Sequence, residues 1–306
     1  ALLIATLMIF LSFQGVTEER ERLHTSDEKF ESNFHDSWTQ GFQEGSIYTD
    51  STVAIGGSEN GGGHVCSVEE ADLSVYCWGD NSRGQLGVGD NIERHRPINP
   101  ALAQFPSEMI SISSGYRHTC GLLSDGSIMC WGRGVEGQLG NGANADSNLP
   151  VQVQIGVGMV ASSISSGSTT SCAILEQLYL PPTGNVVCWG QGNFGQLGNG
   201  VNAGSNTPVF AQLPPGAYAV EISVGWDSVC AIIDDGSVIC WGVGSEGQLG
   251  NGANANSNVP VQVDIPIGRT ATSISSGWHS CSVLDDGSAV CWGRGVEGQL
   301  GNGANA

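Results

Sequence analysis

One tripeptide, Cys-Trp-Gly, occurs five times along this chain of 306 residues. The copies begin at Cys77, Cys130, Cys188, Cys240 and Cys291, at intervals of 51 to 58 residues. Self-similarity at an interval of this size is typical of proteins that stack one supersecondary unit many times. The interval therefore constrains the fold more than any other feature of the sequence.

Each copy has the same internal order. A short apolar segment ends in glycine, as in ISISSG at residues 110–115, and a cysteine-bearing segment, a turn and the Cys-Trp-Gly segment follow. After a glycine-rich loop comes an alternating segment such as PVQVQI at residues 150–155, whose period of two predicts a strand. We expect four short strands per copy and no helix. Because such units cannot bury their faces alone, they should stack radially as a β-propeller with one blade per copy.

The composition agrees with a fold of strands and turns. The chain has 46 glycines and only 13% charged residues, which favours many tight turns and few solvated helical faces. Its formal net charge is -20, whereas binding a phosphate backbone requires the opposite sign. We therefore expect no nucleic-acid partner.

The repeat also resembles that of a known family. The order S-x-G-x-x-H-x-C, D-G-S, C-W-G-x-G-x-x-G-Q-L-G-N-G and x-P-V-x-V over residues 51–306 is similar to the regulator of chromosome condensation repeat. The resemblance implies an all-β propeller, usually of seven blades. The chain carries four full repeats and a fifth without its X-Pro strand, so we expect about five blades, a fragment of a ring that is incomplete at its C-terminal end.

The tryptophans of the five Cys-Trp-Gly copies are predicted to pack each blade against its neighbour, because a packing residue should recur in every blade. The alternative is that they stack on a ligand. They are Trp78, Trp131, Trp189, Trp241 and Trp292.

All ten cysteines fall into five pairs, one per repeat. The pairs are Cys66 with Cys77, Cys120 with Cys130, Cys172 with Cys188, Cys230 with Cys240, and Cys281 with Cys291. Counting outward from a three-residue turn at residues 124–126 places Cys120 opposite Cys130, with a Cα separation of about 4.5 to 5.5 Å. The third pair persists although its hairpin is longer. We predict five disulfides within blades; zinc, which favours C-x2-4-C knuckles, and reduced buried thiols are the alternatives.

The N-terminal region is predicted to be separate from the repeats. Residues 1–15 contain an apolar run shorter than the ~20 residues of a membrane-spanning helix, which indicates a signal peptide or an N-terminal hydrophobic anchor. A buried strand or helix is the alternative. Residues 16–50 are acidic and lack an apolar period, so we expect a disordered spacer.

The leader and the cysteine pairs together predict where the protein works. A signal peptide and disulfide bonds both imply an oxidising compartment, so we expect a secreted or cell-surface protein. Contact with a membrane is expected only through an uncleaved N-terminal anchor.

Three motifs could suggest catalysis, and their context argues against each. G-x-G-x-x-G, as at Gly132, is followed by Gln-Leu-Gly-Asn-Gly, which cannot open the helix that would hold a phosphate. Glu136 and its repeat equivalents share one environment, whereas a catalytic carboxylate pair needs two. His64, His118 and His279 are expected to make structural hydrogen bonds. We therefore expect no enzyme activity, no cofactor and no metal.

The repeats differ most in the loop after the glycine-ending strand, and a longer hairpin interrupts the third repeat. Variable loops on a constant scaffold carry binding sites, and aromatic residues and arginine dominate interface hot spots. The alternative is that these aromatic residues fill gaps between blades. The partner-binding candidates are Tyr116, Arg117, Trp226, Asp227, Trp278 and, in the longer hairpin, Tyr179.

The favoured function is a monomeric, non-catalytic scaffold that binds a protein partner or a surface glycan. The resemblance leaves open guanine-nucleotide exchange with chromatin binding, as in the best-known relatives. A propeller that binds or cleaves polysaccharide is a further alternative; two unmatched acids in a cleft would support it.

Overall fold

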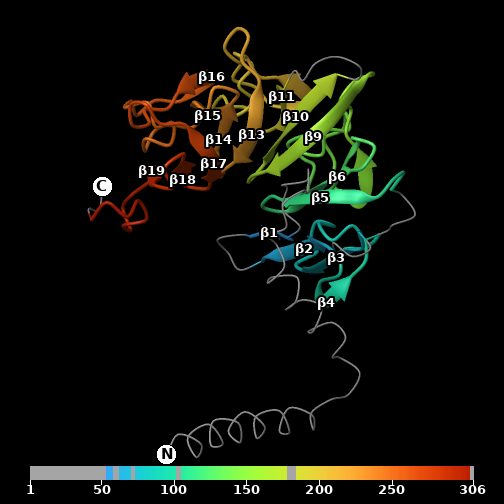
Figure 1. The fold of residues 1–306 in the computed structure, drawn as a ribbon. Coiled ribbons are helices and arrows are strands. Elements are labelled where there is room, and N and C mark those ends of the chain that lie inside the picture. Colours follow the sequence, from blue (N-terminus) through green and yellow to red (C-terminus); the bar gives the residue numbers. More distant parts are fainter. Residues whose placement is uncertain (1–52, 58–61, 70–72, 101–104, 178–183, 304–306) are drawn as a thin grey trace, which may run out of the picture. The chain divides into compact units, whose positions relative to one another are not determined.

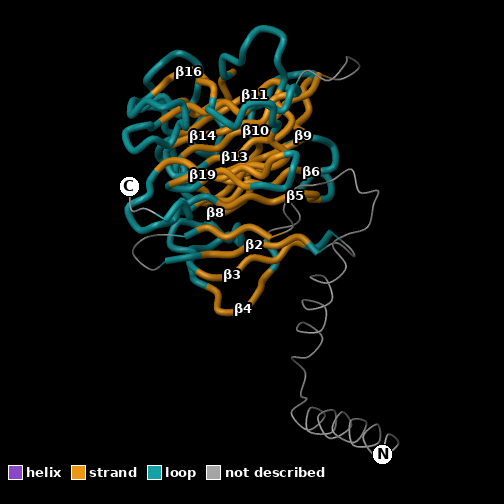
Figure 2. The backbone as a smooth tube through the Cα atoms, turned by 60° about the vertical axis from the view of Figure 1, so that its left-hand side comes forward, coloured by secondary structure: helices purple, strands orange, loops and turns teal. Residues whose placement is uncertain are grey.

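Every regular element that the structure describes is a β-strand (Figures 1 and 2). The structure is a computed structural model that describes residues 53–57, 62–69, 73–100, 105–177 and 184–303, all within one compact unit, Asp50–Ala306. Over these ranges there is no helix of the length and apolar character needed to cross a bilayer. The predicted leader, the predicted spacer and Tyr179 lie outside the described residues.

The strands form five antiparallel sheets, named here blades one to five in chain order. Blade one consists of β1 (Val53–Gly56), β2 (His64–Val68), β3 (Val75–Gly79) and β4 (Arg94–Ile98). Blade two consists of β5 (Met109–Ser114), β6 (His118–Leu123), β7 (Ile128–Gly132) and β8 (Ser147–Gln152). Blade three consists of β9 (Met159–Ser166), β10 (Thr170–Gln177), β11 (Asn185–Gly190) and β12 (Ser205–Phe210). Blade four consists of β13 (Ala219–Val224), β14 (Ser228–Ile233), β15 (Val238–Gly242) and β16 (Ser257–Gln262). Blade five consists of β17 (Ala271–Ser276), β18 (His279–Leu284) and β19 (Ala289–Gly293).

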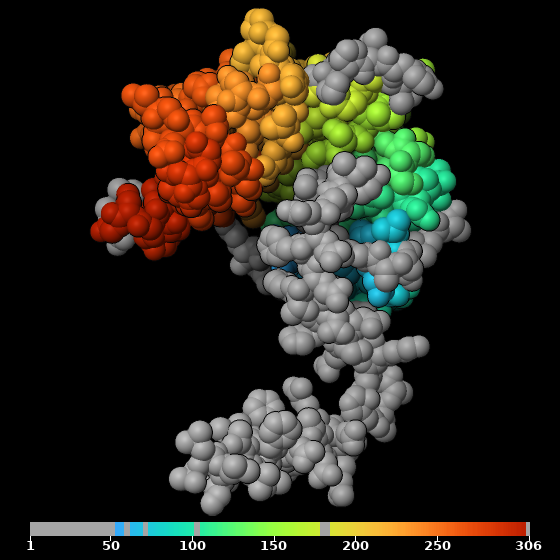
Figure 3. Space-filling view, viewed as in Figure 1, coloured from blue at the N-terminus to red at the C-terminus, as the bar shows by residue number. Residues whose placement is uncertain are grey.

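The blades follow one another radially, as the repeat predicts. Each sheet keeps its strands in chain order, and the innermost strands β1, β5, β9, β13 and β17 contact one another in turn. The five blades form an open arc (Figure 1), and their atoms pack side by side through the green, yellow and orange blades (Figure 3). The predicted all-β propeller architecture is therefore confirmed.

Each blade contains one cross-strand disulfide. Cys120 lies directly opposite Cys130, and the other four pairs are in the same register, including Cys172 and Cys188 in the longer hairpin. The Cα separations are 4.0 to 4.1 Å. This is shorter than the sequence predicts, because the pairs occupy non-hydrogen-bonded positions, where strands approach most closely. The five predicted disulfides are confirmed.

The tryptophans of Cys-Trp-Gly join each blade to the one before it. Trp131, Trp189 and Trp241 are 0% exposed. Each indole nitrogen donates a hydrogen bond of 2.8 to 2.9 Å to a backbone oxygen in the glycine-rich loop of the preceding blade. Trp292 makes the equivalent bond over 3.0 Å, and Trp78 in blade one is half-buried. These contacts are the blade packing that recurrence predicts.

The glycines that end the innermost strands allow the blades to meet closely. A Cβ on Gly115 would lie 2.1 Å from the backbone oxygen of Gly167, and a Cβ on Gly167 would lie 2.0 Å from that of Gly225. No side chain fits at these distances, so glycine is required by close approach and not by an unusual backbone angle. The row of glycines brings the following loops together around the axis.

Candidate functional site

Three of the predicted partner-binding residues meet at the axial end of the blades. Tyr116, Trp226 and Trp278 each follow the glycine that ends an innermost strand, in blades two, four and five. The ring centroids of Tyr116 and Trp226 are 5.5 Å apart with the rings nearly perpendicular, and those of Trp226 and Trp278 are 4.9 Å apart with the rings stacked. We call these three side chains the aromatic cluster. Loops far apart in the sequence thus form one continuous apolar surface.

The aromatic cluster forms part of the wall of a hollow of about 220 Å³. The ends of all five innermost strands line this axial hollow, which also receives the hydroxyl-bearing residues Ser114, Ser166, Ser168 and Ser276. No acidic or basic residue is among the described residues of its lining. The volume suits one medium-sized side chain or chemical group. The hollow can therefore bind by apolar contact and hydrogen bonding.

The guanidinium groups of two arginines lie over rings of the aromatic cluster. The Arg117 guanidinium carbon lies 5.2 Å from the Tyr116 ring centre, and that of Arg294 lies 5.6 Å from the Trp278 ring centre. Trp278 therefore has Trp226 stacked on its ring and a cation over it as well. The members of the aromatic cluster are half-buried, in contrast to the fully buried tryptophans between the blades.

Asp227 follows Trp226 and is the half-buried carboxylate of this loop. Its Oδ1 accepts a hydrogen bond of 3.3 Å from Nε2 of Gln196, which belongs to the glycine-rich loop of blade three. Burial raises the pKa of the Asp227 carboxyl, and the Gln196 hydrogen bond opposes this in part. The sequence singles out Asp227 but not Gln196, which occupies a position where every repeat has glutamine.

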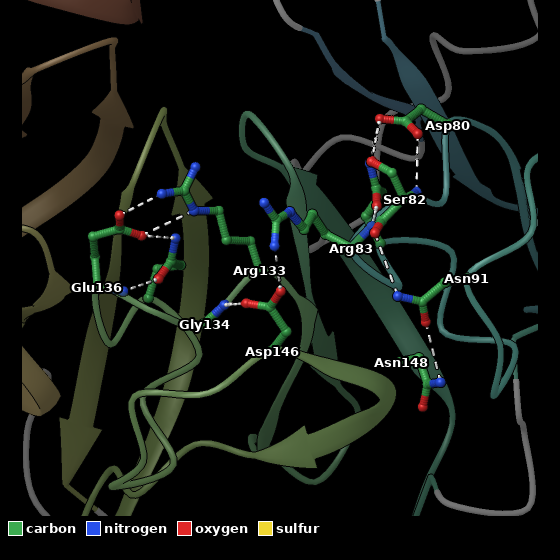
Figure 4. A network of polar contacts seen from close by, with 11 residues as sticks. Asp80, Ser82, Arg83, Asn91, Arg133, Gly134, Glu136, Asp146 and Asn148 are labelled. Carbon is green, nitrogen blue, oxygen red and sulfur yellow. Dashed lines mark hydrogen bonds and ion pairs between the residues drawn. The ribbon is translucent and has the colours of Figure 1, made fainter.

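The glycine-rich loops beside the hollow are held by polar contacts between neighbouring blades (Figure 4). Asp146 accepts a hydrogen bond of 3.0 Å from the backbone nitrogen of Gly134 and one of 3.2 Å from Arg83 of blade one. Arg133 forms an ion pair with Glu136 of the same loop. The central glycine of G-x-G-x-x-G thus donates to a carboxylate of the protein, and turns follow it instead of a helix. This geometry agrees with the rejection of a phosphate-binding loop.

The two buried histidines have structural contacts. Nε2 of His64 lies 2.8 Å from Oγ1 of Thr119, and Nε2 of His118 lies 2.8 Å from the Ser171 hydroxyl oxygen. Each contact crosses the seam, the junction where one blade packs against the next. Burial lowers the pKa of His64 to about 4 and that of His118 to about 3. Both are therefore neutral near pH 7, and the predicted structural hydrogen bonds are confirmed for them.

No group of three or more histidine, cysteine, aspartate or glutamate side chains is placed to hold a metal ion in the described part of the chain. The ten cysteines are consumed by the disulfides. The chemistry available at the aromatic cluster and its immediate neighbours is that of aromatic rings, hydroxyl groups, the guanidinium groups of Arg117 and Arg294, and the Asp227 carboxylate.

The model of the RCC1-like domain family matches residues 33–306. The chain belongs to this family. It is 31% identical over 240 residues to the ultraviolet-B receptor UVR8 of Arabidopsis thaliana. The aligned segment covers 78% of this chain and 53% of UVR8. This confirms the resemblance drawn from the repeat, and the RCC1-like chain spans about half the length of that relative.

Two solved structures with 21% identity show the same fold. Yeast Prp20, solved bound to Kap60, has a TM-score of 0.65 over 79% of this chain and 55% of that one. The ectodomain of the receptor kinase CR4 from Physcomitrella patens has a TM-score of 0.54 over 83% of this chain and 56% of that one. The RCC1-like fold of this chain thus occurs in a protein bound to a partner and in a receptor ectodomain.

Proposed function

We propose that this RCC1-like domain is a non-catalytic scaffold that binds a protein partner at the axial hollow. The observation that carries the proposal is the convergence of Tyr116, Trp226 and Trp278 from three blades onto one half-exposed surface. Aromatic side chains with this arrangement supply large contact area at low entropic cost and dominate binding hot spots. The tryptophans at the junctions between blades two and three and between blades three and four are fully buried, whereas the three members of the aromatic cluster keep part of their surface exposed.

The geometry favours a protein over a glycan. Sugar rings bind aromatic residues by lying flat on an exposed ring face. In the aromatic cluster, Trp278 is stacked on Trp226 and lies beneath Arg294, while Tyr116 lies beneath Arg117. A polysaccharide-cleaving function is disfavoured as well, since glycoside hydrolysis needs two carboxyl groups about 5 to 10 Å apart and the described lining of the hollow contains none.

We further propose that the domain works outside the cell or at its surface. The five disulfides are stable where the medium is oxidising, and the similarity to the CR4 ectodomain supports the use of this fold in such a place. Intracellular regulation, as in the best-known relatives of the family, is the second candidate. The similarity to Prp20, solved with Kap60, supports a protein partner in that case too.

A site-specific photo-crosslinking experiment tests the proposal. A benzophenone amino acid replaces Tyr116 in one sample and Phe210, 54% exposed at the end of the outer strand β12, in the control. Both proteins are produced in the native host and irradiated. We expect a defined adduct from position 116 and none from position 210. Equal adducts at the two positions, or none at position 116, contradict a partner site at the hollow.

Secretion has its own test. A reporter fused to the C-terminal end of the chain should appear in the medium or at the cell surface, with all ten cysteines oxidised. A reporter that stays inside the cell, together with alkylatable thiols, would favour the intracellular alternative.

A further inference from the structure

Arg117, Thr169 and Asp227 occupy the same place in blades two, three and four. The backbone oxygen of each accepts a hydrogen bond of 2.8 to 2.9 Å from the residue that follows Cys-Trp-Gly in its own blade. Three successive blades thus present a cation, a neutral hydroxyl and an anion at equivalent positions beside the axial hollow. The loops carry opposite charges on either side of blade three.

The charge of Arg117 is not neutralised by a carboxylate in the described residues. Its guanidinium lies over the Tyr116 ring, and its Nε is buried without a hydrogen-bond partner. Glu136, which belongs to the same blade, is paired with Arg133. The other carboxylate of blade two at this end, Asp146, is paired with Arg83 of blade one, so within the described residues no ion pair joins either carboxylate to Arg117.

The charge of Asp227 is not neutralised by a described cation either. In blades two and five an arginine follows Cys-Trp-Gly, but in blade four this residue is Val243. Among the described residues, the Asp227 carboxylate accepts a hydrogen bond only from the Gln196 amide. This amide is available because blade three lacks an acidic residue two positions before Gln196. In blade two the equivalent amide, that of Gln138, donates to Glu136 over 3.1 Å, whereas blade three has Phe194 at the position of that glutamate.

We propose that the partner presents a segment that crosses blade three, with an acidic side chain against Arg117 and a basic side chain against Asp227. This inference rests on the proposed function and adds the chemistry of the partner to it. A half-buried charge without a counter-charge is costly, and a partner of the opposite sign removes that cost on binding. The net charge of -20 also favours approach of the basic end.

The test begins with the full, oxidised chain immobilised as bait for a random displayed-peptide library. Peptides are kept when their binding is lost in Trp226→Ala, because these use the proposed site. Among them we expect an acidic and a basic residue at a fixed separation. Asp227→Asn, which preserves shape and the contact with Gln196, should weaken the enriched peptides roughly tenfold, and so should Arg117→Gln.

The matched control is Asp264→Gln. Asp264 is exposed after β16, and the equivalent positions in blades two and three are Gln154 and Gln212, so this change removes one negative charge without disturbing the fold. We expect it to leave peptide binding unchanged. If Asp264→Gln weakens binding as much as Asp227→Asn does, the effect is general electrostatics and the inference is overturned.

A double-mutant cycle separates the two proposals. Replacing the basic peptide residue by glutamine should weaken binding to the parent chain but not to Asp227→Asn, since the two groups contact each other. Additive effects overturn the charge pairing and leave the proposed function standing. A library that yields no peptide dependent on Trp226 counts against the proposed function itself, and this inference then falls with it.

Discussion

The indole nitrogen of Trp189 donates a hydrogen bond of 2.8 Å to the backbone oxygen of Gln138 in the preceding blade. Trp189→Ala should therefore lower the free energy of unfolding by about 3 to 5 kcal/mol, since it leaves a cavity in the seam and leaves the Gln138 oxygen with the longer hydrogen bond, 3.3 Å, from the Ser171 hydroxyl. Trp189→Phe keeps most of the ring and should cost less. Urea denaturation followed by circular dichroism measures both. Equal losses for the two variants would show that the ring's volume contributes little.

Glycines at the same repeat position should differ in how well they tolerate substitution, because the blades approach closely at some of these positions and not at others. A Cβ on Gly115 would meet the Gly167 oxygen at 2.1 Å, whereas a Cβ on Gly277 meets nothing closer than the His279 oxygen at 3.7 Å. We expect Gly115→Ala to destabilise the chain by several kcal/mol or to prevent its folding, and Gly277→Ala to be tolerated. Melting temperatures and yields of folded protein test this. Equal tolerance of both changes would contradict the close packing of the glycine row.

Solvent access predicts the order in which the disulfides are reduced. The eight cysteines of blades one to four are 0% exposed, but Cys281 and Cys291 of blade five are half-buried. A thiolate reductant must reach a sulfur atom, so the Cys281–Cys291 bond should open first in the folded chain of residues 1–306. Brief reduction followed by alkylation and peptide mapping reports the order. Uniform labelling of all five pairs without denaturant would contradict the burial of the first four.

The buried histidines predict a loss of stability in mild acid. The pKa of His118 falls from 6.5 to about 3 on folding, so the unfolded chain gains a proton below pH 6.5 that the folded chain does not. Stability should therefore decrease as the pH falls from 6.5 towards 3, by up to about 1.4 kcal/mol per pH unit for this group.

The variant His118→Thr isolates this contribution, because blade three already has Thr170 at the equivalent position. Between about pH 6.5 and pH 5 the parent chain should lose up to about 2 kcal/mol more than the variant does. Urea titrations at the two pH values give the difference. An identical pH dependence in the two proteins would mean that His118 is accessible to protons in the folded state.

Much of the scaffold could be predicted because each blade repeats the same local rules. The hairpin turn determines which residues face each other, so counting from residues 124–126 placed Cys120 opposite Cys130 correctly. Recurrence identified the seam tryptophans in the same way. Such features depend on short stretches of chain, where strand period and turn geometry leave few alternatives.

The candidate site depended on contacts between repeats, which no single repeat contains. The variable loops pointed to Tyr116, Trp226 and Trp278, but their stacking follows from the way the glycine row brings separate blades together. The contact of Gln196 with Asp227 was not predicted. It arises because Phe194 lacks the carboxylate that other blades offer to this amide, a difference visible in the sequence only once the blades are placed side by side.

The seam hydrogen bonds have a consequence for how this protein can evolve. The acceptor of each tryptophan is a main-chain oxygen, as at Gln138, so no substitution of the acceptor side chain can delete it. Side-chain substitutions in these loops therefore leave the hydrogen-bond acceptors at the junctions between blades in place. The loops at the axial end can therefore accept substitutions, such as an arginine in blade two and an aspartate at the equivalent position of blade four, while the packing between blades stays the same.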